Sequence, residues 1–256
     1  MLSVRQRDIL SLIEAEGAQY IEALSERFGL TTQTIRRDIN ALCDLGYAKR
    51  FHGGVDAPVG ARNISISARA SLNNQAKQRI GRRVAAAIEP GSTVSMGIGS
   101  TVRFVAQALR NHERLRVVTN NLDVALILCD APQIELHMTG GVLRHDDRDV
   151  VGTETLQFFK KFYASYAVVG AGALDADKGV LDFSYSEAET TTTLLANART
   201  RLLVADASKW ERNASMRVVP FSDIDCLFTD HLPAGPATEA LETAKTDVVL
   251  CGADKP

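Results

Sequence analysis

The sequence lacks the marks of a membrane, secreted or metal-dependent protein. Its four cysteines are widely spaced without a CxxC pair, which argues against a zinc or disulfide framework and favours a reducing compartment. The five histidines show no metal-ligand spacing. No apolar run approaches the length that spans a bilayer, and the first ten residues, MLSVRQRDIL, lack the apolar core of a signal peptide. We therefore expect a cytoplasmic protein with no metal, cofactor or membrane partner.

A general excess of basic residues is also missing. The chain has 29 lysines and arginines against 31 acidic residues, for a formal net charge of −2, so a nucleic acid would have to bind at a local basic patch. Internal repeats and low-complexity segments are absent. With 256 residues, of which 45% are hydrophobic, the chain can form one large domain or a small and a medium one.

The first 56 residues contain short helical patterns and no long strand. RQRDILSLIEAEG and YIEALSERFG each predict an amphipathic helix that ends at a glycine. TTQTIRRDINAL predicts a third helix, capped by Thr31 or Thr32. The basic, extended segment YAKRFHGGV then turns at Gly53-Gly54, as a β-hairpin does. Three helices and a basic hairpin predict a winged helix-turn-helix DNA-binding domain over residues 1–56.

The third helix is the element that we expect in the major groove of DNA. Its apolar residues form one narrow stripe, and amide and guanidinium side chains gather on the opposite side. Such groups bond base edges and phosphates. The residues expected to face DNA, on this helix and on the wing, are Thr32, Gln33, Thr34, Arg36, Arg37, Lys49, Arg50 and His52. The alternative is that Arg36 and Arg37 pair with Asp38 or nearby glutamates and that the module contacts protein.

Residues 57–70, within and just after VDAPVGARNISI, are the candidate linker because they contain proline and glycine and no helical period. Beyond them, helical patterns alternate with apolar strand patterns, from the helix NNQAKQRIGRRVAAAI and the strand STVSMGI to the strand DVVLC. Continuous apolar strands between helices predict a mostly parallel sheet that is covered on both faces. Residues 71–256 are thus predicted to form an α/β domain, and the strand-end residues described next make it the candidate effector-sensing domain.

Small polar residues gather where the predicted strands end, at the edge where open α/β sheets bind ligands. MGIGSTV is a strand, a glycine turn and a helix start, and it would present N–H groups and hydroxyls to an anion. Taken singly, these residues are explained by helix caps, turns or surface charge. Together they predict a site for a phosphorylated, hydroxylated small molecule, at Gly99, Ser100, Thr101, Thr119, Asn120, Gly140, Gly141 and Lys209.

Several other chemistries are disfavoured. GIGSTV and GAGALD begin like a dinucleotide-binding fingerprint, but Val102 and Asp175 occupy the position of its third glycine. The sequence has neither a phosphate-binding lysine loop nor a GxSxG nucleophile turn. HDDRD, residues 145–149, hints at a metal, but neighbouring charges in a loop are more often solvated. No catalytic residue or metal ligand is therefore assigned.

The N-terminal segments RQRDIL, ALSERFGLTTQTIRRDINAL and GYAKRFHGG resemble the signature of the DeoR family of bacterial transcriptional regulators. The resemblance extends over essentially the whole chain and implies a C-terminal domain similar to ribose-5-phosphate isomerase. In that enzyme a GADExD-type turn and a downstream lysine transfer protons. Here the turn is GAGALD, with Gly172 in place of the first aspartate and Asp175 retained, and GVLDFSYSEAET has no matching lysine. The resemblance implies ligand binding without isomerisation.

The family resemblance implies a homo-oligomeric repressor, a dimer or tetramer, that binds double-stranded operator DNA and is released by a phosphorylated polyol or sugar. VAQALRNHERLRVVTNNLDVA, LDFSYSEAE and DASKWERNASM point within the family to glycerol 3-phosphate. Its implied contacts are Ser100, Thr101, Asn120 and Lys209, with Asp175 and Glu187 for hydroxyl groups. A different sugar phosphate, an isomerase-type or kinase-like enzyme, and activation instead of repression remain alternatives.

Overall fold

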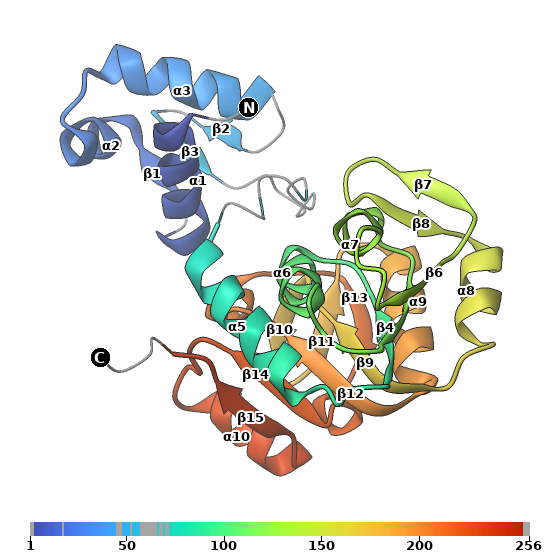
Figure 1. Ribbon diagram of the computed structural model, residues 1–256. Coiled ribbons are helices and arrows are strands. Elements are labelled where there is room, and N and C mark those ends of the chain that lie inside the picture. Colours follow the sequence, from blue (N-terminus) through green and yellow to red (C-terminus); the bar gives the residue numbers. More distant parts are fainter. Residues whose placement is uncertain are drawn as a thin grey trace. The chain divides into compact units, whose positions relative to one another are not determined.

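The computed structural model describes residues 3–16, 18–44, 48–51, 53–56, 66, 69 and 72–252. The chain divides into two compact units, residues 1–72 and 73–256 (Figure 1). Apart from residues 66 and 69, the candidate linker at 57–70 lies outside the described residues, as does His52 of the expected wing.

The N-terminal unit contains three helices and a small antiparallel sheet. The helices are α1 (Val4–Glu16), α2 (Ile21–Phe28) and α3 (Thr32–Asp44). The strands, in the order β1-β3-β2, are β1 (Gln19–Tyr20), β3 (Gly54–Asp56) and β2 (Lys49–Phe51). The predicted helices and basic hairpin are confirmed, and the hairpin gains a third strand, β1, that the sequence did not predict.

Local sequence explains the ends of the helices in this unit. Gly29 ends α2 in the left-handed region, at φ 61°, which glycine adopts with little strain. Thr31 is the capping residue of α3, because its Oγ1 accepts a hydrogen bond from the Thr34 N–H at 3.3 Å. The apolar stripe of α3, Ile35, Ile39 and Leu42, is fully buried and packs with residues of α1 and α2 into one core. That burial turns the polar side of α3 outward.

The C-terminal unit is built on a sheet of seven parallel strands, which confirms the expected α/β class. The strand order is β15-β14-β12-β9-β4-β5-β6. In chain order the strands are β4 (Thr93–Met96), β5 (Arg116–Thr119), β6 (Glu135–Met138), β9 (Ala164–Val169), β12 (Ala198–Val204), β14 (Cys226–Thr229) and β15 (Asp247–Leu250). Six pairings, all parallel, join them.

Helices cover both faces of this sheet, and each face has its own apolar core. One core joins the sheet to α5 (Asn74–Ala87), α6 (Ser100–Leu109) and α7 (Leu122–Leu128). The other joins it to α8 (Thr153–Phe159), α9 (Tyr185–Ala196) and α10 (Pro236–Ala244). Figure 1 shows these two helical layers around the central strands. The central strands are therefore buried on both sides, as their continuous apolar sequences require.

Two smaller sheets and two short 3-10 helices were not predicted. A hairpin pairs β7 (Val142–Arg144) with β8 (Asp149–Val151). An antiparallel sheet joins β10 (Ala173–Asp175), β11 (Gly179–Asp182) and β13 (Met216–Val219). The 3-10 helices are η1 (Ala207–Glu211) and η2 (Phe221–Asp223). Strands this short carry too few residues to show a clear alternation of apolar and polar side chains.

The expectation that the HDDRD segment is solvated is wrong for two of its residues. His145 and Asp146 are exposed, but Asp147 and Asp149 are only 3% and 1% exposed. The reason is Arg144, whose guanidinium lies 2.9 Å from Asp149 and 3.7 Å from Asp147. Pairing with a cation makes the burial of carboxylates tolerable.

Candidate functional site

The strand order reverses between β4 and β9, the two central neighbours of the sheet. From β4 the chain builds outward through β5 and β6, and it then returns beside β4 as β9 and builds outward through β12, β14 and β15. At such a reversal the loops leave the sheet toward opposite faces and open a crevice at the carboxyl ends of the strands. The loops here are Gly97–Gly99 and Gly170–Gly172.

Glycine lets these two loops approach each other closely. A Cβ atom on Gly170 would lie 3.1 Å from the Ile98 carbonyl oxygen. Gly99, the N-cap of α6, has φ 127°, a conformation that side-chain-bearing residues rarely adopt. Because Gly99 has no side chain, it cannot cap the exposed N–H groups of α6. The start of the helix is therefore left to other acceptors.

Ser100 and Thr101 begin α6 at this strand reversal. Each is only 4% exposed, yet among the described residues neither hydroxyl has a hydrogen-bond partner. α6 is ten residues long, so its N-terminus carries the partial positive charge of an ordinary helix. Two free hydroxyls beside uncapped N–H groups form a site that suits a phosphate or carboxylate.

Thr119 and Asn121 support the crevice from β5. The Thr119 hydroxyl donates to the Met96 carbonyl at 2.8 Å and accepts from the Asn121 N–H at 3.0 Å. Its hydrogen-bonding capacity is used within the protein, so the expected ligand contact becomes a brace between β5 and β4. Asn121, which the sequence analysis did not select, donates to the Gly97 carbonyl at 3.2 Å and caps α7. It thereby fixes the glycine loop after β4.

Asn120, between these two, uses the NH2 group of its side-chain amide in a hydrogen bond but not the amide oxygen. Its Nδ2 donates to the Val150 carbonyl at 3.0 Å. Its Oδ1 is buried and has no hydrogen-bond partner in the described part of the chain, and the whole residue is 0% exposed. An unpaired buried acceptor costs about 1–3 kcal/mol. A ligand hydroxyl that donates to this oxygen would remove that cost.

Gly140 and Gly141 form the turn between β6 and β7. Gly141 has φ 141°, and a Cβ there would lie 2.7 Å from the Val151 carbonyl oxygen. The Gly140 carbonyl accepts hydrogen bonds from the hydroxyls of Thr139 and Thr155, and a Cβ on Gly140 would meet nothing within 4 Å. The turn therefore requires glycine at position 141. At position 140 it uses only the backbone carbonyl, which accepts the two hydroxyl hydrogen bonds.

Lys209 lies in η1, directly after β12, and is not the surface charge that the alternative interpretation assumed. It is only 7% exposed. Next to it, burial raises the pKa of Asp206, but the ammonium groups of Lys77 and Lys209, with hydrogen bonds from Ser208 and Asn73, outweigh burial and hold that pKa below its ordinary value. Lys209 therefore stands in a buried, charged environment.

Glu187 faces a cation that the sequence analysis missed. Arg144 Nη1 donates to Glu187 Oε1 at 2.9 Å, and Glu187 is 2% exposed. Burial raises the pKa of Glu187, but hydrogen bonds with Asp182 and Asp147 and the Arg144 guanidinium lower it below its ordinary value. The pair joins the β7–β8 hairpin to α9. The separation of 43 residues between the partners left no local signal of this contact.

Asp175 is not brought together with the other candidates by its contacts. Its Oδ1 accepts from the N–H groups of Asp177 and Lys178 at 3.0 and 2.9 Å, and Oδ2 lies 2.8 Å from Lys178 Nζ. The hydrogen bond from Lys178 lowers the pKa of Asp175. Its carboxylate therefore holds the turn between β10 and β11.

Gly172 has no room for a side chain. A Cβ atom there would lie 2.9 Å from Asp182 Oδ1 and 3.0 Å from the Phe183 ring. The aspartate that the isomerase resemblance places at this position thus conflicts with the packing of β11 and its following residue.

The polar side of α3 is free to contact a partner. Gln33, Arg36 and Arg37 are exposed, and neither arginine forms an ion pair with any described residue. Asp38, the partner proposed in the alternative interpretation, is 5% exposed and instead lies 2.5 Å from Arg5 Nε. The two arginines therefore keep their charge available, which argues against the alternative that they pair with Asp38.

The rest of the expected DNA-contacting residues lie on α3 and on the hairpin. Thr32 and Thr34 are half-buried in the first turn of α3, and Thr34 Oγ1 lies 2.9 Å from Thr31 Oγ1. Lys49 and Arg50 are in β2, and Arg50 is exposed. The hairpin follows α3 in the same unit, as the wing of a winged helix does.

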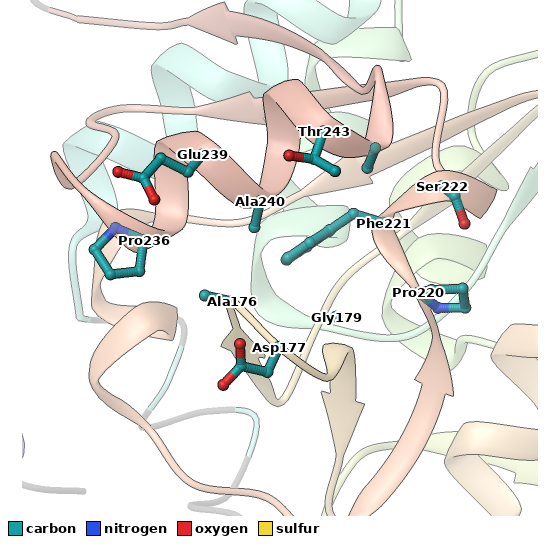
Figure 2. A pocket seen from close by; sticks show the side chains of 11 residues that line it. Ala176, Asp177, Gly179, Pro220, Phe221, Ser222, Pro236, Glu239, Ala240 and Thr243 are labelled. Atoms are coloured by element: carbon teal, nitrogen blue, oxygen red, sulfur yellow. The ribbon is translucent and has the colours of Figure 1, made fainter.

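A separate pocket of about 470 Å³ lies on the sensor unit between α10, η2 and the β10–β11 turn. Figure 2 shows Glu239 on α10, Phe221 of η2 and Asp177 of the turn around it. A neighbouring pocket is lined by Asp175 and Trp210, among others. Neither pocket is lined by Ser100, Asn120 or Lys209, so both are distinct from the crevice at the strand reversal.

Two further properties concern the described ranges as a whole. None of their helices combines the length and the apolar character that crossing a bilayer requires. In the same ranges, no group of three or more histidine, cysteine, aspartate or glutamate side chains is arranged to hold a metal ion.

The winged helix with exposed arginines on α3 and the separate α/β unit are together typical of transcriptional regulators. Comparison with known families specifies the class: the "DeoR-like helix-turn-helix domain" matches residues 5–59, and the "DeoR C terminal sensor domain" matches residues 72–231. The chain belongs to the DeoR family.

Individual relatives agree with this assignment. The glycerol-3-phosphate regulon repressor of Haemophilus influenzae is 37% identical over 97% of both chains. The HTH-type transcriptional repressor CsqR of Escherichia coli is 35% identical over 96% of this chain and 94% of its own. Among solved structures, ribose 5-phosphate isomerase A of Methanocaldococcus jannaschii is similar over 54% of this chain and 55% of its own, with 14% identity and a TM-score of 0.41. The sequence relatives are regulators, so the chain is a transcriptional regulator and not an enzyme.

Proposed function

We propose that this regulator is a homo-oligomeric repressor that binds paired operator half-sites through α3 and its wing, and that a phosphorylated polyol releases it. The observation that carries the proposal is the uncapped start of α6, with the free hydroxyls of Ser100 and Thr101, at the strand reversal of a chain that also presents Arg36 and Arg37. In this proposal the effector binds at the start of α6, and its binding weakens the contacts of Arg36 and Arg37 with DNA.

The proposed DNA contacts follow from the exposure and charge of the N-terminal unit. The first turn of α3 would enter the major groove, with Gln33 at base edges and Arg36 and Arg37 at bases or phosphates. Arg50 on the wing would reach the backbone or the minor groove, and Lys49 and His52 are proposed wing contacts from the sequence alone. Two copies are needed for two half-sites about 34–36 Å apart. Because it would bind operator DNA, the protein is proposed to be cytoplasmic.

The proposed effector is glycerol 3-phosphate, because the crevice offers separate sites for an anion and for a hydroxyl group. The phosphate would bind the N–H groups at the start of α6 with the hydroxyls of Ser100 and Thr101, and Lys209 would approach from β12. A ligand hydroxyl would donate to Asn120 Oδ1, which has no hydrogen-bond partner among the described residues. A name that includes the glycerol-3-phosphate regulon in a relative of 37% identity supports this choice.

The other candidate residues have supporting tasks in this proposal. Gly99 allows the close turn before α6, and Thr119 braces β5 against β4. Gly140 and Gly141 shape the turn that precedes the β7–β8 hairpin. Asp175 and Glu187 are not proposed as direct ligand contacts, because their carboxylates form ion pairs with Lys178 and Arg144.

A thermal-shift panel of phosphomonoesters and their unphosphorylated parents tests the effector. A ligand at 100 times its Kd stabilises the protein by about 2.7 kcal/mol, so glycerol 3-phosphate is expected to raise the Tm and glycerol is not. Ser100→Ala should weaken the effect of the ligand at least tenfold. Ser222→Ala, an exposed serine of the other pocket, is the matched control and should behave as wild type.

The second candidate function is repression that responds to another sugar phosphate. It is favoured by the 35% identity to a repressor with a different name, since the same crevice can serve several phosphorylated ligands. The panel separates the two: a shift with a sugar phosphate and none with glycerol 3-phosphate assigns the other effector. A shift that Ser222→Ala abolishes and Ser100→Ala does not would move the site to the pocket of Figure 2.

A further inference from the structure

The sensor unit begins at Asn73, and this residue has an unusual conformation and an unusual partner. Its φ and ψ are 50° and 34°, in the left-handed region, which costs a residue with a side chain about 1–2 kcal/mol. Although Asn73 is the N-cap of α5, its side chain makes no capping hydrogen bond to that helix. Instead, Nδ2 donates to Asp206 Oδ1 at 2.9 Å, across 133 residues. The start of α5 is thereby tied to the segment after β12.

Asp206 is the centre of a buried charge cluster. It is 1% exposed, and Lys77, from the first turn of α5, is 3% exposed. Lys77 Nζ lies 3.8 Å from Asp206 Oδ2. Asp206 also caps η1, because its side chain accepts the Ser208 N–H. A single carboxylate thus holds α5 on one side and the 3-10 helix that contains Lys209 on the other.

Lys209 takes part in both the proposed ligand site and this cluster. The ammonium groups of Lys77 and Lys209 are the main groups that keep Asp206 ionised against the effect of burial. Charges interact strongly in such a poorly hydrated interior. A phosphate that draws the Lys209 ammonium toward itself would therefore leave Asp206 with Lys77 and Asn73 at the start of α5 and with Ser208 of η1.

We propose that Asp206 and Asn73 are positioning residues that transmit occupancy of the crevice from Lys209 to the start of α5. The inference rests on the proposed function and adds the route by which the signal leaves the ligand site. Asn73 directly follows residue 72, the last of the DNA-binding unit. A shift at Asn73 would thus act on the segment of chain that joins the two units.

The first experiment separates signal transmission from binding. Asn73→Gly removes the amide and keeps the left-handed backbone without strain. In the full-length variant, glycerol 3-phosphate is expected to bind with a Kd within threefold of wild type. The ratio of operator Kd with and without ligand is expected to fall at least tenfold, which is about 1.4 kcal/mol of coupling.

Asn74→Ala is the matched control, one residue further along α5. Asn74 is exposed, and its Oδ1 accepts a hydrogen bond from Gln78 Nε2 at 2.7 Å on the same helix. Its removal also deletes an amide and one hydrogen bond, but no contact with Asp206. This variant should keep the wild-type operator ratio. Equal ratios in Asn73→Gly and Asn74→Ala would overturn the proposal.

A second experiment needs no effector. The Lys77 N–H bonds the Asn73 carbonyl at 3.0 Å, so its hydrogen-exchange rate reports opening of the first turn of α5. We measure this rate in the full chain for wild type, Asn73→Gly, Lys209→Gln and the double variant. If Asp206 links the two residues, the effects should depart from additivity by at least threefold. The same cycle with Asn74→Ala should be additive.

The two experiments also separate failure of this inference from failure of the proposed function. If no phosphomonoester releases the wild-type protein from DNA, the proposed function fails, and the exchange cycle alone decides whether Lys209, Asp206 and Asn73 act as one unit. Additive exchange rates would overturn the inference in that case. Release of the wild type, together with full release of Asn73→Gly, would overturn it while the proposed function stands.

Discussion

Removal of the two free arginines of α3 should change how operator binding depends on salt. Both Arg36 and Arg37 are exposed and form no ion pair within the described residues. Each contact with a phosphate releases counterions and contributes about 0.9 to the slope of log K against log salt. If both contact phosphates, the double alanine variant loses a slope of about 1.8. When the salt concentration rises from 50 to 200 mM, the operator affinity of wild type should then fall by a factor about twelve times larger than that of the variant.

The loss of affinity itself shows what the arginines contact. A bidentate contact with a base contributes about 1–3 kcal/mol and is lost mainly on the specific site, whereas a phosphate contact weakens binding to all sequences. The assay is fluorescence anisotropy at four salt concentrations, with an operator obtained by selection from random duplexes and a scrambled duplex. Arg27→Ala is the control, since Arg27 is also exposed but lies 2.8 Å from Glu16.

Arg27→Ala should leave both affinity and slope close to wild type, because exposed ion pairs contribute about 0–1 kcal/mol to stability. The reasoning would be refuted if Arg36→Ala/Arg37→Ala bound the operator with the wild-type affinity and slope. In that case α3 would not be the reading helix, and the exposure of its arginines would have another cause.

Three further predictions concern the sensor unit. Gly141→Ala should lower the free energy of unfolding by about 1–3 kcal/mol because of its positive φ, whereas Gly140→Ala should change it by less than about 0.5 kcal/mol; chemical denaturation measures both. Gly172→Asp should destabilise by about 1–3 kcal/mol through overpacking, and a Tm equal to wild type would contradict the contact derived for its Cβ. Iodoacetamide at pH 8 should label the exposed Cys129 first, because burial raises the pKa of Cys251 to about 11 and leaves a thiolate fraction of about 10⁻³; mass spectrometry of digests would reveal equal rates if this is wrong.

The features that the sequence predicted well have a local and periodic cause. The apolar stripe of α3 repeats with the helical period, and the strands of the parallel sheet lie in continuous apolar stretches that alternate with helical patterns. Both patterns are visible within a dozen residues and are fixed by burial, so the helices and the parallel sheet were predictable. The segment GIGSTV was equally informative, because a glycine before Ser100 and Thr101 marks the start of α6.

The features that were missed depend on contacts between distant residues. Arg144 binds Glu187 across 43 residues, and Asn73 binds Asp206 across 133, so no window of sequence contains either pair. Asp149 is buried through its own ion pair with Arg144, and the sequence alone favoured a solvated loop for it.

Two candidate residues show that a polar side chain at a strand end has more than one use. The Thr119 hydroxyl bonds the neighbouring strand, and the Asp175 carboxylate closes a turn. Residue type and position were the same as for a ligand contact, and only the internal hydrogen bonds distinguish the cases. Asn120 differs from both because no residue that the structure describes forms a hydrogen bond with its Oδ1.

The central claim is that a phosphomonoester bound at the start of α6 weakens the binding of α3 to DNA. The most direct test is a titration of the protein–operator complex with glycerol 3-phosphate, followed by anisotropy, for wild type and Ser100→Ala. The account predicts that the operator Kd of wild type rises at least tenfold at saturating ligand and that Ser100→Ala needs at least ten times more ligand. An operator Kd that stays constant with every phosphomonoester tested would contradict it.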